Sequence, residues 1–88
     1  MKEIELRDIR AKLRREIESR YGSVTAFVNS EAGKKFGGVK IRPYLYDKGA
    51  VNIKVLSDLY QFFGLGQITR QVVVSRKVSY YVEDSSNA

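Results

Sequence analysis

A stretch near the middle of this sequence combines uncompensated positive charge with aromatic side chains. Residues 33–48 contain five Lys or Arg residues against one acid, Asp47, and so carry +4 of the chain's net charge of +6. Basic side chains that neutralise phosphates release counterions, and arginine and aromatic side chains contact bases. The pattern is typical of a nucleic-acid contact; the alternative is a basic surface loop whose rings pack into the core. The candidate contact residues are Lys34, Lys35, Lys40, Arg42, Tyr44, Tyr46 and Lys48.

This sequence lacks two residue types that enzymes and metal sites commonly use. The 88 residues include no histidine and no cysteine. This removes the usual proton shuttle near neutral pH, the commonest metal ligand and the thiolate nucleophile. We therefore expect a protein that is not an enzyme, with no cofactor, no metal and no small-molecule substrate.

Composition also predicts where the chain works. The N-terminus has no apolar segment like that of a signal peptide, and the longest strictly apolar run is three residues, far short of a membrane span. The lack of cysteine agrees with a reducing compartment. We expect a cytoplasmic protein that has no membrane partner and a single small core, so that dimerisation would bury further surface.

The elements that position the candidate residues follow from apolar periodicity. Residues 4–21 have an apolar side chain every three or four positions, which predicts an amphipathic helix that Gly22 ends. Ser23 is expected to cap a short helix that reaches Ser30, and three glycines predict a loop over residues 31–38. The first helix also has acidic and basic residues four positions apart, which predicts solvated outer faces. These pairs are Glu3–Arg7, Asp8–Lys12 and Glu16–Arg20.

Residues 39–48 fit two conformations. Pro43 could open a short helix that runs to Lys48 and is closed by Gly49. The same residues alternate between apolar and polar side chains, as in an edge strand. We favour the helix.

The remainder of the chain changes from helical to strand periodicity. Asn52 is expected to cap a helix that Gly64 ends, and residues 67–82 predict one long strand or a hairpin that folds near residues 75–77. Residues 83–88 are expected to form a disordered tail. Even-numbered apolar residues of the strand region are predicted to share one face, and four of them are the candidate dimer interface. These four are Val72, Val74, Val78 and Tyr80.

Part of this pattern resembles the helix-turn-helix of Cro- and repressor-type regulators. The resemblance rests on residues 23–28, a glycine-bearing turn, residues 42–46, Gly49 and the capped helix of residues 52–65. It implies a bundle of four helices followed by a dimerising strand or hairpin, in which Ser23 and Thr25 begin the supporting helix. It also implies a recognition helix whose N-terminal residues lie in the major groove. The residues on or near that helix would be Lys40, Arg42, Tyr44, Tyr46 and Lys48.

We therefore expect one domain over residues 1–82, mainly α with C-terminal β. The predicted function is a transcriptional regulator that binds duplex DNA sequence-specifically as a homodimer, with Arg42 reading a base and the lysines contacting phosphates. One alternative is a protein-interaction or inhibitor module that acts by strand addition through residues 67–82. Another is an RNA or single-strand binder in which Tyr44 and Tyr46 stack on bases, which an extended conformation of residues 39–46 would favour.

Overall fold

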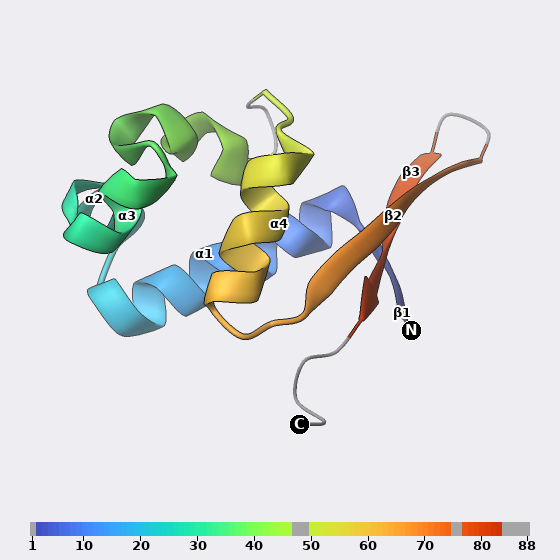
Figure 1. Ribbon diagram of the computed structural model, residues 1–88, viewed down its shortest axis with the longest axis horizontal. Coiled ribbons are helices and arrows are strands. Elements are labelled where there is room, and N and C mark those ends of the chain that lie inside the picture. The colour runs from blue at the N-terminus through green and yellow to red at the C-terminus, as the bar shows by residue number, and fades with distance from the viewer. Residues whose placement is uncertain (1, 47–49, 75–76, 84–88) are drawn as a thin grey trace.

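The computed structural model describes residues 2–46, 50–74 and 77–83 (Figure 1). These residues are mainly helical, with a small antiparallel sheet, so the predicted mainly α chain with C-terminal β is confirmed. No helix among them is long and apolar enough to cross a membrane. The elements are β1 (Lys2–Glu5), α1 (Leu6–Tyr21), α2 (Val24–Asn29), α3 (Glu31–Phe36), the 3-10 helix η1 (Gly38–Leu45), α4 (Ile53–Phe62), β2 (Gln67–Val74) and β3 (Lys77–Glu83).

Three predicted helix ends are confirmed. The Ser23 hydroxyl accepts a hydrogen bond from the backbone N–H of Ala26 at 3.0 Å and so caps α2. The Asn52 side chain caps α4 in the same way, accepting from the N–H of Val55 at 3.3 Å. Gly22 ends α1 with a φ of 90°, a conformation that glycine adopts without steric cost.

The predicted loop over residues 31–38 is wrong, because residues 31–36 form α3. Ser30 caps this helix by accepting from the N–H of Gly33 at 3.1 Å. A Cβ atom at Gly33 would lie 2.0 Å from the carbonyl oxygen of Phe27, so this glycine allows α3 to pack closely on α2. The other two glycines, Gly37 and Gly38, have positive φ angles and do form the turn that ends α3.

Residues 38–45 are helical, but neither predicted form of this segment is correct. The 3-10 helix η1 begins at Gly38, five positions before Pro43, and ends at Leu45, so the expected start at Pro43 and the edge strand are both wrong. The burial of Ile41 and Leu45, one on each side of the proline, explains the helical conformation, since both side chains reach the core. Lys48 and Gly49 lie outside the described residues.

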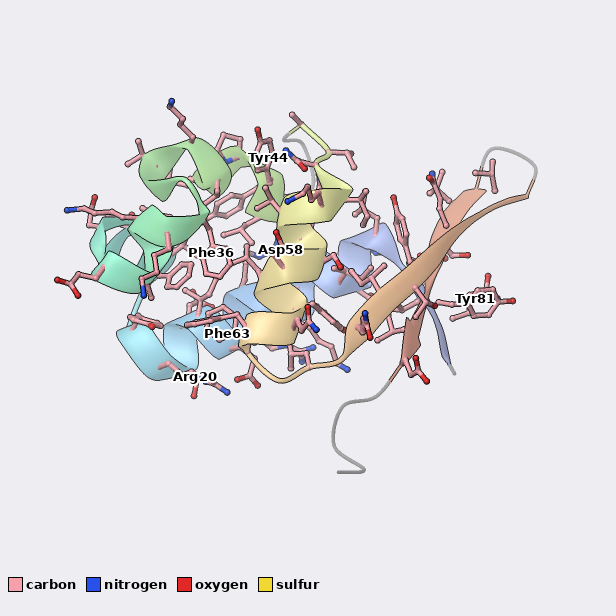
Figure 2. All side chains as sticks on the ribbon, in the orientation of Figure 1. Arg20, Phe36, Tyr44, Asp58, Phe63 and Tyr81 are labelled. Carbon is pink, nitrogen blue, oxygen red and sulfur yellow. The ribbon has the colours of Figure 1, made fainter. Side chains whose placement is uncertain are left out.

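The core lies where α1 and α4 pack together, with α2, α3 and η1 around one end and the sheet at the other (Figure 1). The ring of Phe27 lies between Tyr21 and Phe63, with centroid distances of 4.9 and 5.4 Å. Arg20, near the end of α1, donates to the carbonyl of Phe63 at 3.2 Å and lies over its ring (Figure 2). Arg20 also forms the predicted ion pair with Glu16, at 3.3 Å.

The sheet has the strand order β1-β3-β2, and both strand pairs are antiparallel. Of the two predicted forms of residues 67–82, the hairpin is confirmed and the single long strand is wrong. The helix predicted over residues 4–21 begins at Leu6, two residues later than expected. Ile4 pairs instead with Tyr80, so the start of the chain forms a sheet edge against its last strand. β3 includes Glu83, the first residue of the predicted tail, and residues 84–88 lie outside the described part of the chain.

A bulge at Thr69 changes which residues of the hairpin share a face. Ile68 pairs with Val82, but the next pair is Arg70 with Tyr81, so β2 contains one extra residue. A shift of one residue exchanges the two faces of a strand. Beyond the bulge, the register places Gln71 opposite Tyr80 and Val73 opposite Val78, whereas Val72 and Val74 pair with Ser79 and Lys77. The predicted common face of Val72, Val74, Val78 and Tyr80 is therefore wrong.

Candidate nucleic-acid interface

The segment from the end of α3 through η1 forms a basic surface, which we call the α3–η1 surface. Residues 34–46 contain no acid. Ile41 and Leu45 fix η1 on the core, and the four basic side chains of the segment are exposed. These four are Lys34, Lys35, Lys40 and Arg42. Two apolar side chains of η1 thus face the core, while the basic side chains of the segment face solvent. Contact with phosphates requires such exposed basic side chains.

The turn of Gly37 and Gly38 brings two of these lysines together. A Cβ atom at Gly38 would lie 4.0 Å from Cγ of Lys34, and one at Gly37 would lie 3.9 Å from Cβ of Lys40. The stems of Lys34 and Lys40 therefore flank the same two glycines, although the lysines come from different helices. Both lysines are exposed, and no acidic residue stands between them in the sequence.

Arg42 and Tyr46 lie against each other at the far end of η1. The Cζ atom of Arg42 is 5.6 Å from the centroid of the Tyr46 ring, and the ring is 38% exposed. The Cζ atom of Arg14, from α1, lies 5.4 Å from the same centroid, and Arg14 donates a hydrogen bond to the carbonyl of Leu45. One ring thus contacts two guanidinium groups from two elements.

Arg10 is the main structural residue that sequence reasoning missed. It is 2% exposed, and its guanidinium donates to the carbonyls of Tyr44 at 2.9 Å and Ala50 at 3.1 Å. The last carbonyls of a helix lack partners within it, and a cation near them is favourable. Arg10 and Arg14 precede Leu13 and Ile17 by three positions each, which places both arginines at the flank of the buried stripe of α1. This spacing is the sequence feature from which the burial of Arg10 could have been predicted.

The other predicted contact residues occupy different places. Ser23 and Thr25 are exposed at the start of α2, but the Ser23 hydroxyl is already the cap of that helix. Tyr44 is half-buried and packs against the core (Figure 2), as expected from the alternative in which the rings of this segment pack into the core. Lys48 lies outside the described residues.

The predicted dimer interface is only partly available at the surface. Tyr80 is 3% exposed and belongs to the core, so its assignment to the interface is wrong, and Val78 is half-buried against the same core. The side chains of Val72 and Val74 lie outside the described part of the structure. Val73 is instead 61% exposed, on an edge strand.

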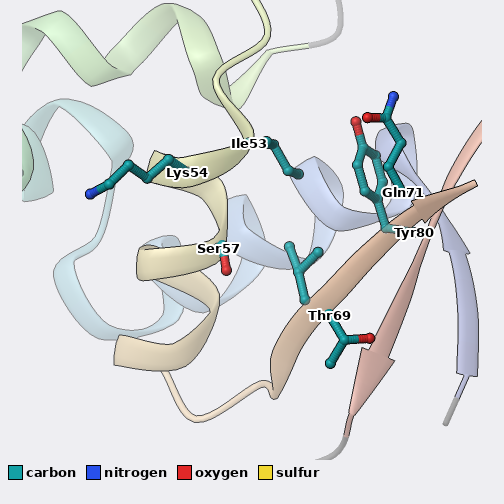
Figure 3. Close-up of a pocket in the computed structure, with 7 residues that line it drawn as sticks. Ile53, Lys54, Ser57, Thr69, Gln71 and Tyr80 are labelled. Carbon is teal, nitrogen blue, oxygen red and sulfur yellow. The ribbon is translucent and has the colours of Figure 1, made fainter.

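A groove lies between α4 and β2 (Figure 3). Its volume is about 280 Å³, and Ile53, Ile68 and Tyr80 give it an apolar floor beside Lys54 and Gln71. This is at the lower limit of small-molecule sites. Within the described ranges, no group of three or more acidic residues is placed to hold a metal ion.

Comparison of the chain with protein-family models, curated proteins and solved structures found no match.

Proposed function

We propose that this chain binds duplex DNA sequence-specifically as a homodimer and regulates transcription. The observation that carries the proposal is the α3–η1 surface, where Lys34, Lys35, Lys40 and Arg42 are exposed and no acid interrupts residues 34–46. In this proposal the lysines contact phosphates and Arg42 donates to a guanine edge in the major groove. A helix-turn-helix arrangement, with α2 as the supporting helix and η1 in the recognition position, is part of the same proposal.

The conformation of residues 38–45 supports duplex over single-strand binding. An extended segment would have presented both tyrosines for stacking on unpaired bases, but the segment is helical and Tyr44 packs against the core. A helix that carries its basic residues outward has the shape that the major groove admits.

The open edge of β2 supports the homodimer. β3 is the central strand, so β1 and β2 each have an edge with no neighbour among the described strands. β1 is short and has three charged residues in four, a pattern that discourages pairing. Residues 71–74 of β2 carry no charge and include the exposed Val73. A second copy that pairs along β2 would cover this edge and give the dimer the two-fold symmetry that a palindromic DNA site requires.

The proposal is tested by a fluorescence anisotropy titration of the whole chain against duplex DNA, single-stranded DNA and RNA at several salt concentrations. If each subunit contacts about four phosphates, the logarithm of the duplex affinity should fall against the logarithm of salt concentration with a slope of about −3.6 per subunit. Arg42→Ala should weaken binding to the preferred site more than to random duplex, and Lys40→Ala should weaken both equally. Tighter binding to single strands, or a duplex affinity that is insensitive to salt, would refute it.

A further inference from the structure

Tyr46 leaves η1 in a conformation that returns its ring to the preceding turn. Its backbone is extended, with φ −118° and ψ 146°, while its N–H donates to the carbonyl of Pro43 at 3.3 Å. The ring therefore meets Arg42, four positions earlier, and the Arg42 Cζ atom lies 5.6 Å from its centroid. The contact joins an exposed cation to a ring that is fixed by the end of the helix.

The ring is also held from the side of α1. Arg14 is half-buried, donates to the carbonyl of Leu45 and has its Cζ atom 5.4 Å from the Tyr46 centroid. Because Arg14 is attached both to the backbone beside Tyr46 and to the ring, it limits the positions that the ring can take. Arg42 therefore contacts a ring whose position Arg14 restrains.

We propose that Tyr46 is the positioning residue for Arg42, holding the guanidinium in the orientation from which it reads a base. This inference rests on the proposed DNA binding and adds the source of its specificity. A free arginine side chain has many rotamers and loses that freedom when it makes two hydrogen bonds to guanine. The Arg42 Cζ atom lies over the Tyr46 ring, 5.6 Å from its centroid, and a guanidinium held over a ring can still donate N–H groups to a base. Tyr46 acts through Arg42 and contacts no base itself.

The first test measures the free protein. In NMR spectra of the wild-type chain, the ring current of Tyr46 should shift the side-chain Nε–Hε signal of Arg42. Tyr46→Phe keeps the ring and should preserve this shift, whereas Tyr46→Leu should remove it and increase the fast motion of the Arg42 side chain. Thermal unfolding of each variant checks that the fold is intact. An Arg42 signal that is the same in the wild type and in Tyr46→Leu would overturn the proposal.

The second test measures discrimination, the ratio of the dissociation constants for random duplex and for a duplex that the wild type selects from a random-sequence pool. Tyr46→Leu should reduce this ratio about tenfold and change the affinity for random duplex little, while Tyr46→Phe should resemble the wild type. Adding Tyr46→Leu to Arg42→Ala should cause no further loss, because both changes remove the same contact.

The outcomes separate the two proposals. If the wild-type chain binds no duplex, or binds selected and random duplex equally, both the proposed function and the base readout by Arg42 are refuted. Wild-type discrimination that persists in Tyr46→Leu leaves DNA binding standing and overturns only the positioning by Tyr46. Additive losses in the double variant would mean that Tyr46 contacts DNA independently of Arg42, which also overturns the positioning.

Discussion

Arg10 donates a hydrogen bond from its Nε to the backbone carbonyl of Tyr44 at 2.9 Å, joining the second turn of α1 to the end of η1. The same guanidinium reaches the carbonyl of Ala50 and is almost fully buried. The conformation of the α3–η1 surface therefore depends on a charged residue of another helix.

Replacing Arg10 should destabilise the whole domain. Arg10→Met should lower the free energy of unfolding by about 3 kcal/mol, because two carbonyls lose a buried, charged donor. Arg15→Met is the matched control, since Arg15 is exposed on the same helix, and it should change stability by less than about 0.5 kcal/mol. Urea unfolding followed by circular dichroism measures both variants, and equal midpoints would contradict the structural role of Arg10.

The close contact of α3 with α2 predicts a large effect at Gly33. Gly33→Ala should destabilise the fold by about 3 kcal/mol, because the added Cβ would lie 2.0 Å from a backbone oxygen that cannot move alone. Gly22→Ala meets nothing within 4 Å and carries only the cost of its positive φ, about 1 kcal/mol. Thermal unfolding compares the two variants. If Gly33→Ala proved the milder change, α3 would not pack on α2 as described.

The open edge of β2 predicts a concentration-dependent dimer. Val73→Asp should increase the monomer fraction in sedimentation velocity, because a charge on the exposed edge disfavours pairing with a second strand. Val39→Asp introduces the same charge at a valine that is similarly exposed, on η1, and should leave the dimer intact. A wild-type chain that remains monomeric at about 100 µM, where a pairing with Kd in the micromolar range would be nearly complete, would exclude dimerisation through this edge.

Local chemistry accounts for the parts of the fold that the sequence predicts well. The caps at Ser23 and Asn52 and the stop at Gly22 depend on hydrogen bonds and φ angles within a few residues, so their residue types carry the signal. The basic character of residues 34–46 is likewise a property of the sequence itself.

Contacts between distant residues account for the parts that the sequence does not predict. Gly33 is indistinguishable from a loop glycine until α2 lies against it. The bulge at Thr69 exchanges the faces of β2, and no residue type near it marks the extra position, so the predicted common face was wrong. The strand β1 forms by pairing with β3, where Ile4 lies opposite Tyr80, 76 positions later in the sequence. The burial of Arg10 depends on carbonyls at least 34 positions away.

The central claim is that duplex DNA binds the α3–η1 surface, and a comparison of two charge-matched double variants tests it most directly. Lys34→Gln with Lys40→Gln removes two charges from that surface, whereas Arg7→Gln with Lys12→Gln removes two from α1, where Glu3, Glu5 and Asp8 are close by. Duplex affinity is measured for both across a salt series. The first variant should bind at least about tenfold more weakly at low salt and have a salt slope smaller by about 1.8, and the second should stay near the wild type. Equal losses in the two variants would mean that net charge alone attracts the DNA, and would contradict the claim.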